Sequence, residues 1–389
     1  MREPALVPRM RPFGSTIFAE MTALAQRTGA VNLGQGFPDT DGPAGMLAAA
    51  RDAITGGVNQ YPPGPGTAEL RAAVAEHRTR YGTEYDPDRE ILITVGATEA
   101  ITAALLALVE PGDEVVVIEP YYDSYAAAVA LSGATRRVVG LREAPDGRFA
   151  LDLDALRAAV GPRTRAILLN SPHNPTGTVF TRDELAAVAA VCVEHDLIAI
   201  TDEVYEHLSY DGVPHIPLVT LPGMAERTVT ISSAGKTFNC TGWKIGWACG
   251  PAELIAAVRA TKQFLTFVGG APFQPAVAHA LRHELDWVAS LRSSLQDKRD
   301  RLSAGLSAAG FAVRPTQGTY FVCADVRPLG FTDGAELCWA LPDRIGVAAV
   351  PVQVFVDDPE PWRHLVRFAF CKRDEVLDEA ILRLGKLRA

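Results

Sequence analysis

The sequence predicts an α/β protein with a mostly parallel sheet flanked by helices and a second, smaller α+β domain. From about Glu90 to Leu265, short β-branched runs alternate with alanine-rich stretches, the pattern of parallel strands connected by helices. The chain has 389 residues, of which 48% are hydrophobic and 21% charged. This length exceeds what one hydrophobic core usually serves, and the composition is that of a compact folded protein.

Apolar runs and amphipathic stretches give the expected elements and domain boundaries. The predicted strands of the large sheet are Ile91–Val95, Glu114–Ile118, Ala166–Leu169, Ile198–Thr201, Thr228–Ser232 and Ile245–Cys249. Helices are expected at Glu99–Leu108, Arg182–Glu194, Ala252–Phe264 and Trp287–Ala309. The last of these is long and amphipathic, and strand-like segments follow it. We place the large domain at residues 41–285 and the small domain at 286–389, and expect residues 1–40 to pack against the small domain.

Charge and cysteine usage exclude several classes of protein. The net charge of −9 and the pI near 5.5 argue against nucleic acid as a partner. Residues 1–13 contain three arginines and no apolar core of a secretory signal, and no apolar stretch reaches the length of a membrane span. We therefore expect a cytoplasmic protein without a membrane segment. The six cysteines have no paired spacing and are expected to be buried thiols, and the eight dispersed histidines predict no metal site.

Polar residues follow directly on the predicted strands. In a doubly wound sheet such residues line one edge, where ligands usually bind. They are Gly96–Thr98, Tyr122, Asn170–Asn174, Asp202–Tyr205 and Ser232–Lys236. The sequence therefore predicts one ligand site at this edge.

The segment from Ser232 to Lys244 (SSAGKTFNCTGWK) has the features of a cofactor anchor. A lysine that forms a Schiff base needs space for a flat ring and a lowered amine pKa. Small residues before Lys236 provide the space. Lys244 and the hydroxyl of Ser233 are suited to neutralise a phosphate, which leaves Lys236 to bond covalently to pyridoxal phosphate.

This segment resembles the lysine signature of the class I and II aminotransferases, which are fold-type I pyridoxal-phosphate enzymes. The resemblance runs from the segment NLGQGFPD at Asn32 to Arg367 and beyond. It implies pyridoxal 5'-phosphate as cofactor, with Lys236, Asp202 and Tyr205 as catalytic residues. The implied reaction is ping-pong: Lys236 is displaced by an amino acid and then moves a proton between Cα and the cofactor, and a 2-oxo acid later takes up the amino group.

Asp202 and the loop after Asn170 match two further family motifs. Asp202 ends an apolar strand, where its carboxylate can keep the pyridine nitrogen protonated. The resemblance assigns Tyr205 and Asn174 to the phenolic oxygen of the cofactor, and makes Asn174–Pro175 a candidate cis peptide. His173 is expected to be a partly exposed loop residue. Taken alone, these fragments also fit a helix-capping aspartate and an ordinary turn.

The phosphate and ring of the cofactor have their own candidate partners. Gly96, Ala97 and Thr98 stand between a strand and a helix, a position that favours anion binding. By resemblance they form the phosphate cup, and Tyr122 stacks on the cofactor ring. Tyr61 lies in a rigid loop rich in proline and glycine. In relatives the equivalent tyrosine crosses a dimer interface to the phosphate, which implies a homodimer with shared active sites.

Arg367 interrupts an apolar strand pattern and is the candidate ligand of the substrate carboxylate. Its planar guanidinium suits a carboxylate bidentately, and an internal salt bridge is the alternative. Resemblance also places Gly36 and Asn174 near that carboxylate and Phe18 beside the substrate side chain.

The subgroup that the chain resembles contains kynurenine, glutamine and methionine aminotransferases, together with actinobacterial succinyldiaminopimelate aminotransferases. We expect an L-amino acid donor of apolar, aromatic, glutamine or methionine type and a 2-oxo acid acceptor. N-succinyldiaminopimelate is the alternative substrate, and β-elimination from cysteine conjugates is a conceivable side activity. An effector-sensing domain of a transcription regulator or an inactive paralogue is disfavoured, since no helix-turn-helix segment precedes Gly34 and the lysine, aspartate, tyrosine and arginine are all present.

Overall fold

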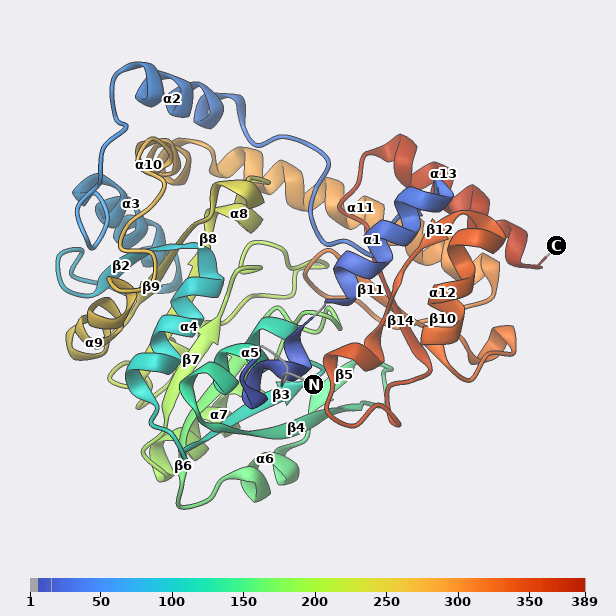
Figure 1. Ribbon diagram of the computed structural model, residues 1–389, viewed down its shortest axis with the longest axis horizontal. Helices are drawn as coiled ribbons and strands as arrows, with labels where there is room; N and C mark the ends of the chain where they lie inside the picture. Colours follow the sequence, from blue (N-terminus) through green and yellow to red (C-terminus); the bar gives the residue numbers. More distant parts are fainter. Residues whose placement is uncertain (1–5, 15, 389) are drawn as a thin grey trace, which may run out of the picture.

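The computed structural model describes residues 6–14 and 16–388, and its two parts each contain a sheet (Figure 1). Residues 1–5, which include Arg2 of the three arginines noted above, lie outside the described residues. The larger sheet has eight strands. In spatial order they are β2 (Ile91–Val95), β9 (Ile245–Cys249), β8 (Thr228–Ser233), β7 (Ile198–Asp202), β6 (Thr164–Asn170), β3 (Glu114–Glu119), β4 (Thr135–Glu143) and β5 (Phe149–Leu151).

The centre of this sheet is parallel, as predicted. Strands β8, β7, β6, β3 and β4 pair in parallel, β9 is antiparallel to both of its neighbours, and β5 is antiparallel to β4. All six predicted strands are present. Strand β4 escaped prediction because it carries Arg136, Arg137, Arg142 and Glu143 and is buried only in part, which weakens the hydrophobic pattern.

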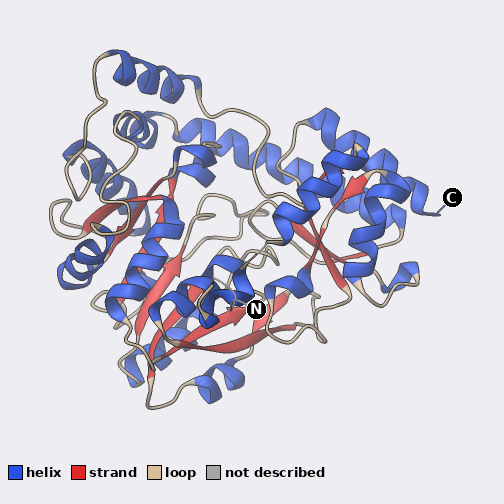
Figure 2. Ribbon diagram, in the orientation of Figure 1, coloured by secondary structure: helices blue, strands red, loops and turns tan. Residues whose placement is uncertain are grey.

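Helices cover both faces of the sheet (Figure 2). Successive side chains of a strand point to opposite faces, so Val115 and Val117 pack on one side and Val116 on the other. The first face is covered by α4 (Gly96–Leu108), α5 (Asp123–Ser132) and α9 (Ala252–Lys262). The second face is covered by α6 (Leu153–Ala159), α7 (Arg182–Glu194), α2 (Ala44–Thr55), α3 (Ala68–Arg78) and α10 (Phe273–His283). A capping box formed by Thr181 and Glu184 fixes the start of α7.

The smaller part combines an antiparallel sheet with helices from both ends of the chain. Its strand order is β10 (Ala312–Val313), β11 (Phe321–Asp325), β14 (Leu365–Ala369) and β13 (Val350–Pro351). The helices are α11 (Leu285–Ala309), α12 (Gly334–Ile345), α13 (Asp374–Leu384) and α1 (Ile17–Thr28), and α8 (Ala234–Thr237) belongs to the larger part. Strand β1 (Val31–Asn32) pairs in parallel with β12 (Val347–Ala348).

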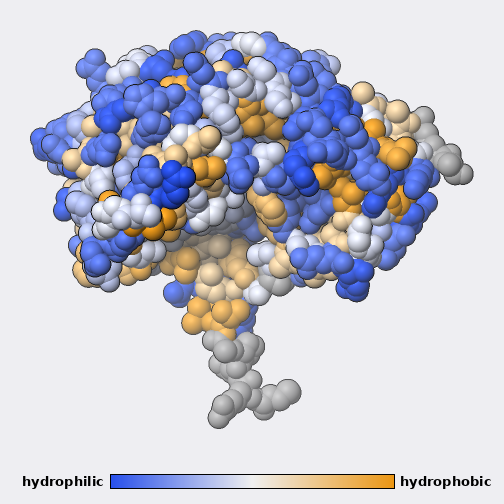
Figure 3. Space-filling view, turned by 90° about the horizontal axis from the view of Figure 1, so that it is seen from above, coloured by the Kyte–Doolittle hydropathy of each residue, from blue (hydrophilic) through white to orange (hydrophobic). Residues whose placement is uncertain are grey.

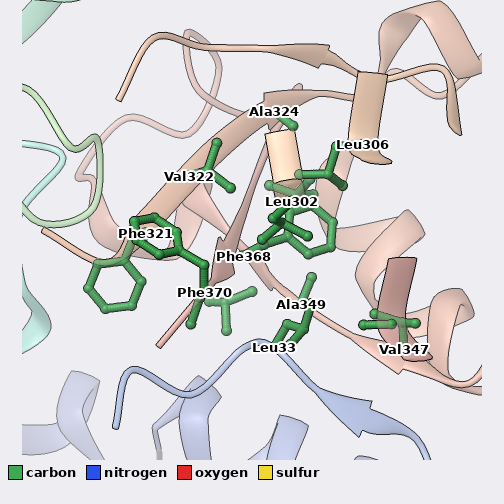
Figure 4. Close-up of a cluster of buried hydrophobic side chains, with 14 of the residues drawn as sticks. Leu33, Leu302, Leu306, Phe321, Val322, Ala324, Val347, Ala349, Phe368 and Phe370 are labelled. Atoms are coloured by element: carbon green, nitrogen blue, oxygen red, sulfur yellow. The ribbon is translucent and has the colours of Figure 1, made fainter. Parts of the chain in front are cut away.

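One core holds the N-terminal segment to the smaller part (Figure 4). Leu33 lies in it with Leu302 and Leu306 of α11, Phe321 of β11 and Phe368 of β14. Burial of such side chains contributes roughly 1.5–3 kcal/mol each. Leu33 thus shares a core with the smaller part, and the division into residues 1–40, 41–285 and 286–389 stays a prediction.

Polar residues cover most of the face in Figure 3, and apolar residues form separate patches on it. Within the described ranges, no helix combines the length and apolar character needed to cross a membrane. The six cysteines are free and buried, as predicted.

Candidate active site

A cavity of about 320 Å³ lies at the carboxyl edge of the large sheet. Strands β2, β6, β7 and β8 run in the same direction, and the residues that end or follow them meet at this edge. The cavity is lined by every predicted site residue except Tyr61: Phe18, Gly36, Gly96, Ala97, Thr98, Tyr122, Asn174, Asp202, Tyr205, Ser233, Lys236, Lys244 and Arg367. The fold thus gathers residues that are up to 349 positions apart (Phe18 to Arg367).

Lys236 lies in α8, the single helical turn that follows β8. Its Nζ donates a hydrogen bond to the hydroxyl of Tyr320 at 2.7 Å and to the carbonyl oxygen of Gly36 at 3.3 Å. Burial lowers the pKa of this amine to about 8, because the charged form loses its hydration. A substantial fraction of the amine is therefore neutral near physiological pH, which is the form that bonds to a carbonyl carbon.

Asp202 ends β7 and is buried at the floor of the cavity. It accepts a hydrogen bond from the hydroxyl of Tyr125 at 2.6 Å and one from the backbone N–H of Val204 at 3.2 Å. Burial raises the pKa of the carboxyl, against the opposing effect of these hydrogen bonds. A cationic group placed beside Asp202 would lower this pKa again, because it would stabilise the charged carboxylate.

Asn174 connects the large sheet to Arg367. Its backbone N–H donates to Oδ1 of Asn170 at 2.7 Å, and its own Oδ1 accepts a hydrogen bond from Arg367 at 2.9 Å. The Asn174–Pro175 peptide is cis, which confirms that prediction.

Arg367 is a buried cation without an acidic partner. Its side chain is 1% exposed and donates to Asn174 and to the carbonyl oxygen of Gly34 at 2.9 Å. Among residues 6–14 and 16–388, no carboxylate lies within 4.0 Å of its guanidinium, so the alternative of an internal salt bridge is wrong. Its guanidinium lies 3.9 Å from the ring centre of Phe321 and 5.3 Å from that of Phe18. Aromatic faces partly offset the cost of a buried cation.

Gly36 allows this close packing. A Cβ at Gly36 would lie 2.3 Å from a ring atom of Phe321, so any larger residue would push Phe321 away from Arg367. The carbonyl oxygen of Gly36 also accepts the hydrogen bond of Tyr320 at 2.5 Å.

The start of α4 forms a cradle for an anion. Gly96, its first residue, has a φ of +74°, and a Cβ there would lie 2.9 Å from Nζ of Lys244. Glycine therefore lets the Lys244 ammonium approach the helix start, where unpaired N–H groups and the helix dipole favour negative charge. Thr98 and Ser233 add hydroxyls to the same wall.

Tyr61 does not line the cavity. Its side chain is 82% exposed, and its ring lies 5.5 Å from that of Phe267, which is also exposed. A role for Tyr61 at the phosphate of the same chain has no support in this arrangement.

Three neighbours of the site carried no predicted role: Tyr125 beside Asp202, Tyr320 beside Lys236, and Phe321 beside Arg367. Tyr125 reaches the site from α5, Phe321 from β11 and Tyr320 from the bend before β11, and the sequence did not reveal how these segments are oriented. Tyr125 stands three residues after Tyr122 at the start of α5, and this helical spacing was the one available signal.

The expectation for His173 is wrong: it is 1% exposed, its Nδ1 lies 2.8 Å from the hydroxyl of Thr176, and burial lowers its pKa to about 3.

The family model for aminotransferase class I and II matches residues 28–384. The chain belongs to this family. It is 64% identical over 98% of both chains to a probable N-succinyldiaminopimelate aminotransferase of Mycobacterium tuberculosis. The solved structure of N-succinyldiaminopimelate aminotransferase from that organism superposes with a TM-score of 0.96, covering 98% of this chain and all of the other at 65% identity. A methionine aminotransferase of Escherichia coli is 40% identical over the full length of both chains.

The protein is therefore a pyridoxal-phosphate-dependent aminotransferase that acts on amino acids and oxo acids. The residues present fit this cofactor. The cavity combines a lysine of lowered pKa, a buried carboxylate and an anion cradle of glycine and lysine. These are the groups required by an aldehyde, a pyridine nitrogen and a phosphate, respectively.

Proposed function

We propose that the aminotransferase acts on N-succinyldiaminopimelate. The observation that carries this proposal is the 64% identity, over 98% of both chains, to the probable N-succinyldiaminopimelate aminotransferase. Such a substrate is a long amino acid with further carboxylates far from its reacting amino group, so it requires a cavity that opens toward a second cation.

A second cation, Lys372, lies behind one wall residue of the cavity; it does not itself line the cavity and is 6% exposed. Phe37 lines the cavity, and its side chain is 47% exposed. The Nζ of Lys372 lies 4.5 Å from the ring centre of Phe37 and donates to its carbonyl oxygen at 2.8 Å. An ammonium has three donors, so two of them are available to a distal carboxylate that extends past Phe37. We assign Lys372 to this recognition.

The other residues have the following proposed roles. Bound pyridoxal phosphate supplies the electron sink for negative charge that develops at Cα. Lys236 holds the cofactor and, once displaced, moves the proton from Cα. Asp202 keeps the pyridine nitrogen protonated, and Arg367 binds the α-carboxylate. The anion cradle, formed by Gly96, Ala97, Thr98, Ser233 and Lys244, holds the phosphate. Tyr122 lies against the ring, while Tyr205 and Asn174 donate to the phenolic oxygen.

Methionine is the second candidate donor. Phe18, Phe321 and Ile101 give the cavity an apolar wall, and a methionine aminotransferase is 40% identical over the full length. An unbranched thioether packs well against such a wall.

A half-reaction distinguishes these donors. We would mix the holoenzyme with N-succinyl-L,L-diaminopimelate or with methionine, without any oxo acid, and follow the visible absorption of the bound cofactor. The proposal predicts faster loss of absorption with the succinylated substrate. It also predicts that Lys372→Met slows this reaction about tenfold while leaving methionine unchanged, the size expected for one charged hydrogen bond. A wild-type enzyme that reacts with methionine alone would overturn the assignment.

We also propose a homodimer in which Tyr61 reaches the phosphate of the partner's cavity. Support comes from the exposure of Tyr61 together with Phe264, Leu265 and Phe267, whose exposed fractions lie between 45% and 84%. Adjacent exposed apolar residues favour an interface. Light scattering tests the dimer, and Tyr61→Phe should weaken cofactor binding about tenfold. A monomer with full activity would contradict the proposal.

The cytoplasm is the proposed compartment, since the six buried cysteines are unpaired.

A further inference from the structure

The fold brings together histidines that are dispersed in the sequence. His77 lies in α3, and Glu206 and His207 lie in the loop after β7. One ligand atom from each lies within 4.8 Å of those of the other two. The Nε2 atoms of His77 and His207 are 3.0 Å apart. We call these three residues the His-Glu cluster.

Arg80 contacts both rings. Its guanidinium donates to Nε2 of His77 at 3.0 Å and to Nδ1 of His207 at 3.2 Å. A nitrogen that accepts a hydrogen bond carries no proton, so both imidazoles are neutral. The proton of His207 is then on Nε2, which donates to His77. Neutral imidazole is the form that ligates metals.

Two buried carboxylates stand beside the cluster. Arg78 pairs with Glu203 at 3.2 Å and with Glu206 at 3.1 Å, and Nε2 of His215 lies 3.1 Å from Glu203. Arg80 has a different environment. It is itself exposed, and among the described residues it forms no ion pair with a carboxylate. It contacts the two imidazoles and the ring of Tyr81.

We propose that the His-Glu cluster is a binding site for a borderline divalent cation of the Zn²⁺ class, which replaces the Arg80 guanidinium. Two histidines and a carboxylate are a common ligand set for such ions. On a tetrahedral ion with Zn–N bonds of about 2.0–2.1 Å, two nitrogens are about 3.3 Å apart, close to the 3.0 Å between the two rings. When Arg80 turns into solvent, the proton of His207 moves from Nε2 to the vacated Nδ1, and Nε2 becomes free to ligate.

The surroundings support this exchange. Glu206 is held by Arg78 and by the hydroxyl of Ser232, which donates to it at 2.6 Å. Such outer contacts orient metal ligands. A second cavity of about 420 Å³ is lined by Arg80, Glu206 and His207. It gives the ion a path of entry and room for a water molecule as fourth ligand.

Titration of the chelator-treated holoenzyme with Co²⁺ tests the proposal, because the ion's d–d absorption reports its coordination. We expect one Co²⁺ per chain, displaced by Zn²⁺. His207→Gln removes a proposed ligand. Loss of even an outer-shell contact typically weakens a metal site about 10–100-fold, so this variant should weaken Co²⁺ binding at least tenfold. Arg80→Ala should tighten Co²⁺ binding about tenfold. This is the effect of removing the repulsion in water between a unit charge and a divalent ion some 6 Å away.

A second histidine pair provides the matched control. His279 and His283 stand one helical turn apart in α10, with ring centres 4.8 Å apart. The double variant His279→Gln/His283→Gln should leave Co²⁺ binding unchanged. Binding that disappears in this variant, or no binding by either the wild type or Arg80→Ala, would overturn the proposal. Retained cofactor absorption in each variant shows that it is folded, and Arg80→Ala tests the site without altering a buried residue.

Discussion

Two buried arginines of this molecule have opposite surroundings. Arg78 is fully buried and pairs with Glu203 and Glu206, whereas Arg367 is 1% exposed and has no carboxylate partner among the described residues. Burying a charge costs free energy unless a partner compensates it. Both carboxylate partners of Arg78 come from the chain itself. The incomplete surroundings of Arg367 support the proposal that its carboxylate comes from the substrate.

The pKa shifts of Glu206, beside Arg78, and of Lys236, in the cavity with Arg367, differ in the same way. Burial alone would raise the pKa of Glu206, but Arg78 holds it well below its usual value. At Lys236 no such compensation prevails, and burial lowers the amine pKa to about 8. Arg78 thus keeps the Glu206 carboxylate charged, whereas the cavity favours the neutral amine of Lys236.

The largest expected effect is at Lys236. Lys236→Ala removes both the covalent anchor and the proton carrier, so steady-state transamination should fall by more than about 10⁴-fold, the upper range for an acid–base group alone. A coupled assay of oxo acid formation measures this. Thr241→Ala, which alters another residue of the cavity wall, is the control and should keep most of the activity.

Asp202 should follow in size. Asp202→Asn retains the shape of the side chain and removes the charge that we propose holds the pyridine nitrogen protonated, so kcat should fall about 10²–10³-fold. Tyr125→Phe keeps the carboxylate and removes one hydrogen bond, and should cost about tenfold. Equal kcat values in Asp202→Asn and Tyr125→Phe would show that the negative charge of Asp202 does not drive catalysis.

Arg78 should affect stability and leave the chemistry intact. Arg78→Met leaves two buried carboxylates uncompensated and should lower the free energy of unfolding by about 3–5 kcal/mol. Arg363→Met, which breaks the exposed pairs with Asp333 and Glu360, should cost at most about 1 kcal/mol. Denaturant unfolding measures both. Equal losses of unfolding free energy in the two variants would show that the buried pairs of Arg78 stabilise the fold no more than the exposed pairs of Arg363.

The smallest effect is a pH dependence of cofactor uptake. The neutral amine of Lys236 attacks the cofactor, so the rate at which apoenzyme recovers its visible absorption should rise about tenfold per pH unit up to about pH 8 and then level off. An exposed lysine would continue to rise toward pH 10. A plateau well above pH 8 would contradict the lowered pKa.

The sequence predicted the large sheet and the composition of the site because both depend on local patterns. Apolar runs indicate strands, and the residues after Val95, Asn170, Thr201 and Ser232 are placed by the parallel topology. The lysine signature then assigned these residues, by resemblance, to one cofactor, and their individual roles stay predictions.

Contacts between distant segments were not predictable in this way. Tyr320 reaches Lys236 across 84 positions and Arg78 reaches Glu206 across 128, and no local periodicity encodes either distance. The same reason explains why His77 and His207, unremarkable in the sequence, lie 3.0 Å apart.

The most direct test of the account concerns the unpaired Arg367. The half-reaction of the best amino acid donor is compared with that of the same compound lacking its α-carboxylate, in the wild type and in Arg367→Gln, by the visible absorption of the bound cofactor. The account predicts that the wild type prefers the amino acid by at least about 30-fold, the lower end for a buried charge pair, and that the variant loses most of this preference. A variant that keeps the wild-type preference would show that another group binds the carboxylate.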